Sequence, residues 1–229
     1  MHRIVHPTIA VCALFVCAPL LAQDNYEIQV YGSDTVERGA TMVELHSNYT
    51  PDGLPLDEHR AHETLEITHG FTPWFETGFY VFTAAGSGWD FVGSHVRPRV
   101  RVPAEWNWPV GVSLSAEFGY ARSKFAEDQW SWELRPIIDK EMGRWYVSFN
   151  PAFENRFAFA PAVNVKYDVT PKVAGGVEYY GGGGSQQLFP SVDLNLSPDW
   201  EFNAGVGFGL NHSTDRLILK MILGRRFGR

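Results

Sequence analysis

Residues 110–121 read VGVSLSAEFGYA, and residues 200–211 read WEFNAGVGFGLN. In both stretches apolar side chains alternate with glycine, small polar or charged side chains, which is the period of a β-strand with two unlike faces. Strands of soluble sheets typically have ~5–6 residues, whereas a strand that crosses a bilayer at a tilt needs ~9–11. These two stretches therefore predict strands long enough to cross a membrane.

The same alternation recurs from residue 41 onward. It predicts twelve strands, at roughly 41–49, 62–71, 74–84, 91–102, 110–121, 129–138, 144–150, 161–169, 172–181, 187–196, 200–211 and 215–224. Short turns such as Thr72-Pro73 and Thr170-Pro171 alternate with mostly longer loops rich in Gly, Ser, Asp and charge. An even strand number with this layout is typical of bacterial outer-membrane barrels, whose short turns face the periplasm. The predicted fold is an all-β, transmembrane, antiparallel up-and-down barrel over residues 41–229, with both termini in the periplasm.

The two faces of these strands indicate which solvent surrounds the barrel. One face is apolar, and the other is small and charged. The charged members of the second face are Glu44, Glu66, Glu76, Arg97, Arg99, Arg101, Glu117, Glu133, Arg135, Lys166, Asp168, Glu178, Asp193, Glu201 and Lys220. A soluble lipocalin-like barrel, the structural alternative, has about eight strands and fills its interior with apolar side chains. The charged face cannot be such a core, which favours a polar lumen and an exterior in lipid.

Tryptophan side chains gather near strand ends and turns of the predicted barrel. They are Trp74, Trp106, Trp108, Trp130, Trp132, Trp145 and Trp200. Trp and Tyr rings favour the level of the lipid headgroups, so these residues predict aromatic girdles in contact with outer-membrane lipid. Ordinary core aromatics of a soluble sandwich are the alternative.

The last strand resembles the closing strand of outer-membrane β-barrels. In that class an alternating apolar strand ends in an aromatic residue, which the barrel-assembly machinery recognises during insertion. The corresponding residues here are Leu217, Leu219, Met221, Leu223 and Phe227. Arg225 interrupts the series, and Gly228-Arg229 follow the aromatic, so the match is incomplete. The resemblance is one of architecture, and it implies a porin-like barrel in the outer membrane.

The first 22 residues have the pattern of a secretory signal peptide. A basic and polar start precedes an apolar run at 9–21, and cleavage is expected after Ala22. A membrane anchor is the alternative, but the apolar run is shorter than the ~20 residues that a spanning helix needs. Residues 23–40 are expected to form a periplasmic segment or, through the alternation at 26–31, an extra strand.

The mature chain is acidic and has no cysteine. Both cysteines, Cys12 and Cys17, lie in the predicted signal peptide. Removing Arg3 from the 19 basic residues leaves 18 against 26 acidic residues. This balance argues against a nucleic-acid partner. Without disulfides, a closed hydrogen-bonded barrel in lipid is one source of stability.

The most distinctive polar pattern is a basic ladder of residues spaced by two, which therefore all point into the lumen. Its members are His95, Arg97, Arg99 and Arg101. The ladder could attract anionic solutes, as arginine-lined pores do. It could instead be balanced by acidic partners in the lumen, since charges kept from bulk water need partners. The partners expected are Glu44, Glu76, Glu117 and Glu133. Pairing about the turns places Arg99 near Glu76. It also places His95 near Glu117. Closing the barrel could bring Lys220 near Glu44.

The width of the lumen is left open by the sequence. Twelve strands lie between eight, where side chains fill the interior, and sixteen, where an aqueous channel remains. Charged side chains oppose open space, whereas inward glycines favour it. These glycines are Gly111, Gly119, Gly176, Gly205, Gly207 and Gly209. No loop is long enough to be an obvious plug.

One loop has residue types that an enzyme could use, namely His212 and Ser213 with Asp215. Barrel enzymes that act on lipids place histidine and serine two positions apart on one face, so that base and nucleophile meet. Here the two are adjacent and would diverge. The remaining histidines lack the spacing of metal ligands. They are His46, His59, His62 and His69. The sequence therefore predicts no catalytic centre, metal or cofactor.

Taken together, these patterns predict a narrow porin-like channel for passive diffusion of small solutes. A non-conducting structural or partner-binding barrel is the main alternative, because the charges inside are nearly balanced. A lipid-modifying enzyme is the third hypothesis, and it depends on the 212–215 loop alone.

Overall fold

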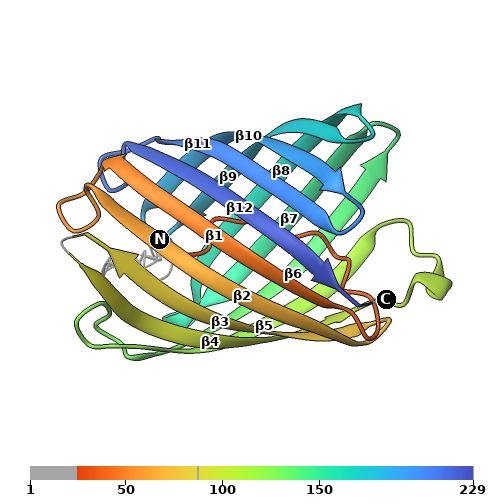
Figure 1. The fold of residues 1–229 in the computed structure, drawn as a ribbon, viewed down its shortest axis with the longest axis horizontal. Coiled ribbons are helices and arrows are strands. Elements are labelled where there is room, and N and C mark those ends of the chain that lie inside the picture. Colours follow the sequence, from red (N-terminus) through yellow and green to blue (C-terminus); the bar gives the residue numbers. More distant parts are fainter. Residues whose placement is uncertain (1–24, 87, 229) are drawn as a thin grey trace, which may run out of the picture.

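The chain forms a closed antiparallel β-barrel of twelve strands (Figure 1). The computed structural model describes residues 25–86 and 88–228, so the predicted signal peptide lies outside the described residues. Each strand pairs with the next along the chain, and β12 pairs with β1 to close the barrel. The predicted fold class and strand number are confirmed. Among the described residues, no helix is long and apolar enough to span a bilayer.

The strands are ten to thirteen residues long. They are β1 (Thr41–Asp52), β2 (Arg60–Thr72), β3 (Phe75–Ala85), β4 (Trp89–Arg101), β5 (Gly111–Ala121), β6 (Trp130–Met142), β7 (Trp145–Glu154), β8 (Ala158–Thr170), β9 (Val173–Gly182), β10 (Ser185–Ser197), β11 (Trp200–Gly209) and β12 (Leu217–Phe227). Single turns of 3-10 helix occur at η1 (Ala104–Trp106) and η2 (Asn155–Phe157).

The largest difference from the predicted boundaries is at β7 and β8. Residues 151–160 were expected to form a loop, but only 155–157 do so. Proline cannot donate to a strand ladder, so Pro151 and Pro161 are unusual within paired strands. In the structure these two prolines lie opposite each other in the β7–β8 register. The β6–β7 ladder is interrupted beside Pro151, so the barrel accommodates the missing donor at an irregularity rather than at a strand end.

The two ends of the barrel differ in their connections. The turn end carries residues 73–74, 102–110, 143–144, 171–172 and 198–199. The loop end carries residues 53–59, 122–129, 155–157, 183–184 and 210–216, together with the β3–β4 connection. The C-terminal end of β12 lies at the turn end (Figure 1).

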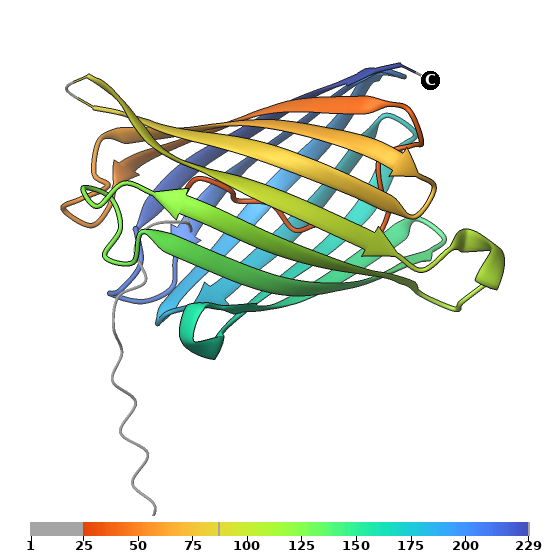
Figure 2. The ribbon, with the colours of Figure 1, turned by 90° about the horizontal axis from the view of Figure 1, so that it is seen from below.

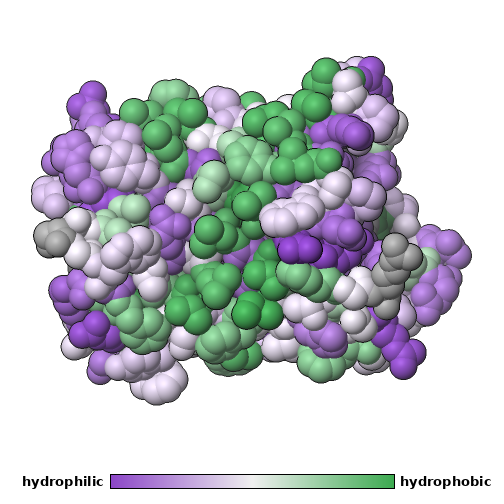
Figure 3. Space-filling model, viewed as in Figure 1, coloured by the Kyte–Doolittle hydropathy of each residue, from purple (hydrophilic) through white to green (hydrophobic). Residues whose placement is uncertain are grey.

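The outer surface of the barrel is apolar around its middle. Large apolar side chains such as Leu65, Phe79 and Phe118 are 41%, 46% and 61% exposed. Figure 3 shows a hydrophobic zone across the middle of one face, with hydrophilic residues toward both ends. Exposed tryptophans flank this zone, among them Trp130 at the loop end and Trp145 at the turn end. Soluble proteins rarely expose a contiguous apolar surface of this extent, so the belt fits a lipid bilayer.

The inward glycines make room for neighbouring side chains rather than for open space. A Cβ added to Gly119 would lie 2.1 Å from the ring of His95. A Cβ added to Gly207 would lie 2.3 Å from the ring of Phe189. The expectation that these glycines widen the lumen is therefore wrong at both positions.

Candidate functional site

The basic ladder of β4 lies inside the barrel. Its members are His95, Arg97, Arg99 and Arg101. The β3–β4 register pairs Arg99 with Glu76, and Arg99 Nη2 lies 2.7 Å from Glu76 Oε1. His95 Nδ1 lies 3.6 Å from Glu117 Oε2. Both pairs expected from the hairpin turns are therefore present in the lumen.

Arg97 is the most enclosed cation of the ladder, with 2% of its surface exposed. Its Nη2 donates to Glu66 Oε1 at 2.7 Å, and its Nη1 lies 3.5 Å from Glu27 Oε1. The guanidinium also lies 4.2 Å from the centroid of the Tyr31 ring. A guanidinium held by two carboxylates presents little free positive charge to a passing solute.

The other two acidic residues expected as partners, Glu133 and Glu44, differ in their contacts. Glu133 is bound on its own strand by Arg135, whose Nε lies 2.6 Å from Glu133 Oε1. Glu44 is buried, with 7% of its surface exposed. Within residues 25–86 and 88–228, the structure shows no hydrogen bond or ion pair of the Glu44 carboxylate.

The expected approach of Lys220 to Glu44 is not found. The β1–β12 register pairs Glu44 with Gly224. Lys220 Nζ instead lies 2.5 Å from Glu178 Oε2 and donates to the Ile28 carbonyl at 3.2 Å. The sequence could not fix this register because no hairpin turn joins β12 to β1.

The N-terminal segment, residues 25–40, lies inside the barrel (Figures 1 and 2). At the loop end, Asn25 Nδ2 donates to Asp215 Oδ2 at 2.9 Å. The segment then runs through the lumen to Ala40, which precedes β1 at the turn end. The structure thus places these residues within the lumen rather than in a periplasmic extension or an added strand, and it places Asn25 at the loop end. The segment that fills the lumen therefore precedes the first strand and is not one of the loops.

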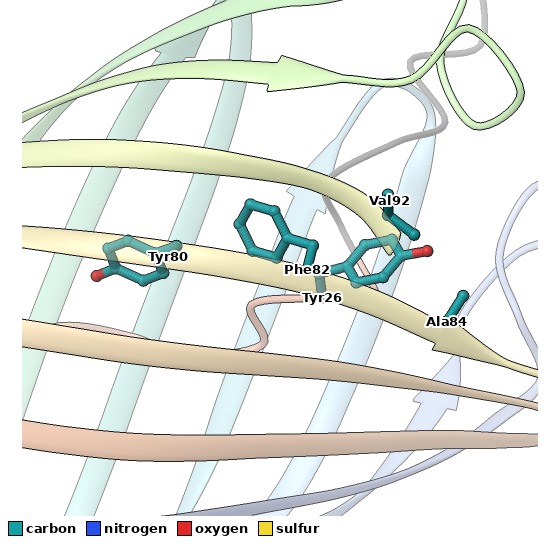
Figure 4. Close-up of a cluster of buried hydrophobic side chains, with 5 residues drawn as sticks. All are labelled: Tyr26, Tyr80, Phe82, Ala84 and Val92. Carbon is teal, nitrogen blue, oxygen red and sulfur yellow. The ribbon is translucent and has the colours of Figure 1, made fainter. Parts of the chain in front are cut away.

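Tyr26 anchors the loop-end half of the segment in an apolar cluster. The cluster consists of Tyr26, Tyr80, Phe82, Ala84 and Val92 (Figure 4). The Tyr26 ring meets the Phe82 ring edge-on, with centroids 5.6 Å apart. Thr64 Oγ1 on β2 donates to the Tyr26 carbonyl at 2.7 Å. The buried aromatic rings and the hydrogen-bonded Tyr26 carbonyl together hold this end of the segment against the barrel wall.

Polar wall residues on β6 and β7 hold the middle of the segment. The Tyr31 N–H donates to Asn150 Oδ1 at 2.8 Å, and the Tyr31 carbonyl accepts from Ser148 Oγ at 2.5 Å. The Ser33 N–H and Oγ each donate to Asp139 at 2.7 Å. These side chains supply the hydrogen bonds that a neighbouring strand would otherwise supply. These residues were not predicted as a site, although Ser148 and Asn150 stand on the inward parity of β7.

Successive stretches of the segment line three cavities. Residues 25–26 line a cavity of about 280 Å³ at the loop end. Residues 27–29 line a cavity of about 70 Å³ beside β6 to β10. Residues 29–32 and 34–36 line a larger cavity of about 570 Å³ in the turn-end half of the barrel. The last of these, the turn-side cavity, is large enough to hold many water molecules or a small solute.

We expect Gly70→Ala to destabilise the protein at the contact between Gly70 on β2 and residues 36–37 of the N-terminal segment. A Cβ at Gly70 would lie 2.2 Å from the Val36 carbonyl oxygen and 2.3 Å from the Glu37 carbonyl oxygen, and backbone atoms yield less readily than side chains. Overpacking of this kind costs about 1–3 kcal/mol. Chemical denaturation of the refolded protein measures the effect. Gly175→Ala, where a Cβ meets nothing within 4 Å, is the matched control, and equal midpoints for the two variants would contradict the expectation.

The 212–215 loop does not bring His212, Ser213 and Asp215 into the hydrogen-bonded arrangement that a catalytic triad requires. The Asp215 carboxylate accepts the Leu54 N–H at 2.7 Å and the Asn25 amide at 2.9 Å. Burial raises the pKa of Asp215, although these two hydrogen bonds oppose the rise. His212 and Ser213 are exposed at the tip of the loop. Asp215 therefore serves as an anchor for Asn25 and for the β1–β2 loop.

Comparisons with solved structures show the same architecture. The KdgM porin matches with a TM-score of 0.57 and 14% identity, covering 82% of this chain and 99% of the porin. Omp33 of Acinetobacter baumannii matches with a TM-score of 0.56 and 12% identity, covering 86% and 100%. The chain has the fold of an outer-membrane β-barrel.

This fold is shared by barrels of different functions. Outer membrane phospholipase A of Escherichia coli also matches, with a TM-score of 0.50 and 10% identity over 93% of this chain and 97% of the enzyme. No protein-family model matches the chain, and no curated protein sequence matches it. At these identities the likeness shows the fold, so the function of the barrel has to be argued from its lumen.

Proposed function

We propose that this protein is an outer-membrane channel of the porin type, narrowed by its own N-terminal segment, for passive diffusion of small solutes. The observation that carries the proposal is the turn-side cavity, a polar space of about 570 Å³ enclosed by a barrel with an apolar belt. In this arrangement the turn end faces the periplasm and the loop end faces outward. Insertion would use the barrel-assembly machinery.

The charge of the turn-side cavity favours small cations or neutral solutes. Eight carboxylates line it, against five cationic side chains. The carboxylates are Asp34, Glu44, Glu66, Glu76, Glu141, Glu178, Asp193 and Glu201. The cations are Arg97, Arg99, Lys166, Lys220 and Arg226. A KdgM porin structure holds oligogalacturonate, whose carboxylates an acidic lumen would repel. The anion-attracting interpretation of the basic ladder is therefore the weaker one for this chain.

A non-conducting barrel is the second candidate, and the N-terminal segment is the observation that favours it. The segment is held by wall residues of several strands, which limits the space left for a solute. A lipid hydrolase has less support, because the Asp215 carboxylate is bound by Asn25 and Leu54 rather than by His212.

The refolded protein is expected to open small, cation-preferring channels in planar bilayers. Replacing Glu141 and Glu201, two cavity carboxylates for which no ion pair is found among the described residues, with glutamine should move the reversal potential in a KCl gradient toward zero. Glu105→Gln on the exposed η1 turn is the matched control. The absence of openings at every voltage would overturn the channel proposal and leave the non-conducting barrel. An unchanged reversal potential in the double variant would show that the cavity carboxylates do not set the cation preference.

A further inference from the structure

Glu44, His46 and Glu66 meet on the inner wall of the barrel. Glu44 and His46 are two positions apart on β1, so both point inward, and Glu66 lies opposite Glu44 in the β1–β2 register. One ligand atom from each of the three side chains lies within 4.8 Å of the others. All three are more than nine-tenths buried. Spacing along a single strand could not reveal this cluster, because the third member comes from the neighbouring strand.

The cluster has an uncompensated charge. Like charges directly opposite each other on neighbouring strands are destabilising. Glu66 has compensation, because Arg97 Nη2 and Thr68 Oγ1 both donate to its Oε1, at 2.7 and 2.6 Å. Glu44 has no direct hydrogen bond or ion pair among the described residues, yet it is 7% exposed. A buried carboxylate without a partner calls for a cation or a proton.

The free atoms of the cluster are those that a metal ion would use. The contacts at Glu66 Oε1 leave its Oε2 turned toward His46, whose Nε2 lies 3.4 Å away. Within the part of the chain that the structure describes, neither ring nitrogen of His46 has a hydrogen-bond partner. An imidazole nitrogen and two carboxylate oxygens suit Zn²⁺, whose bonds to such atoms measure about 2.0–2.2 Å. Modest side-chain rotations would bring the three atoms to a shared ion.

We propose that Glu44, His46 and Glu66 form a binding site for a divalent transition-metal ion of the Zn²⁺ class on the lumen wall. Glu44 and Glu66 both line the turn-side cavity, so an ion can enter from that side, and water from the cavity can fill the remaining coordination positions. Thr68 positions Glu66 through its hydroxyl. The site does not depend on whether the barrel conducts.

Zn²⁺ binding to the full refolded protein, freed of metal by chelation, tests the site. We expect one Zn²⁺ per chain in competition with a chromophoric chelator, and Co²⁺ should give the visible absorption of a low-coordinate site with nitrogen and oxygen ligands. Glu44→Gln and His46→Ala should each abolish this binding, whereas Thr68→Ala should weaken it about tenfold or more. His62→Ala is the matched control, because His62 is also buried and lies 3.3 Å from a carboxylate, that of Asp57.

Two results would overturn the proposal. One is the absence of stoichiometric Zn²⁺ binding by a protein that shows the mobility shift of a folded barrel between unboiled and boiled gel samples. Glu44 would then be neutralised by a proton instead. The other is Zn²⁺ binding that persists in both Glu44→Gln and His46→Ala, which would place the ion on surface histidines or carboxylates. Because Glu44→Gln keeps the side-chain volume, the same gel assay separates loss of the site from loss of the fold.

Discussion

Deleting residues 25–38 is expected to raise the single-channel conductance several-fold. The deleted segment contacts β1, β2, β6, β7 and β12 from inside the barrel. It lines three cavities, and its removal should merge them into one continuous space. The wall strands pair with one another without help from the segment, since the closed ladder begins at Thr41. Planar-bilayer recordings of the refolded variant measure the change.

A full-length variant shows whether a rise in conductance comes from emptying the lumen or from shortening the chain. Replacing Tyr26, Ile28 and Tyr31 with serine keeps the segment but removes its buried apolar anchors. We expect this variant to flicker between a low and a high conductance, because the segment can leave the wall but stays tethered to β1. A deletion variant that folds and conducts no better than the parent protein would show that the segment does not limit the passage.

Arg97→Met is expected to be the most destabilising single substitution in the lumen, at about 3–5 kcal/mol. Removing the guanidinium leaves Glu66 and Glu27 buried without their shared cation. It also removes the nearest of three guanidinium groups that lie over the ring of Tyr31. Urea unfolding of the refolded protein in lipid or detergent measures the loss.

An exposed ion pair provides the matched comparison. Lys124 Nζ lies 2.7 Å from Asp90 Oδ2, and both side chains are well exposed. Lys124→Met should therefore cost no more than about 1 kcal/mol. Adding Glu66→Leu to Arg97→Met should restore part of the lost stability by removing one orphaned carboxylate. Similar unfolding midpoints for Arg97→Met and Lys124→Met would contradict the importance of the lumen pair.

Whether a feature of this protein could be predicted from its sequence depends on how far apart in the chain the interacting residues lie. Alternation such as that at 110–121 reports directly on two unlike faces, so the barrel and its twelve strands could be predicted. Pairs across a hairpin, such as Arg99 with Glu76, could be predicted too, because a tight turn sets the register. The partner of Lys220 could not, because Glu178 lies on β9, three strands from β12, and the two side chains meet only through the curvature of the wall.

The lumen segment was beyond sequence reasoning for a related reason. Residues 26–31 alternate like a strand, yet their backbone groups bond to wall side chains such as Thr64 and Asn150. Such bonds exist only once the strands are assembled, and nothing in the local pattern of the segment records them. The Glu44, His46 and Glu66 cluster likewise arises from two strands.

The path of the segment also bears on how fast this protein reaches its native state. The hydrogen bond between Asn25 and Asp215 joins residues 190 positions apart, and the β1–β12 pairing joins the two ends of the barrel. Contacts between residues so distant in sequence are slow to form, because a long loop must close before any of them is gained. The contacts of Asn25 at the loop end and the seam between β1 and β12 are therefore expected to be among the last to form.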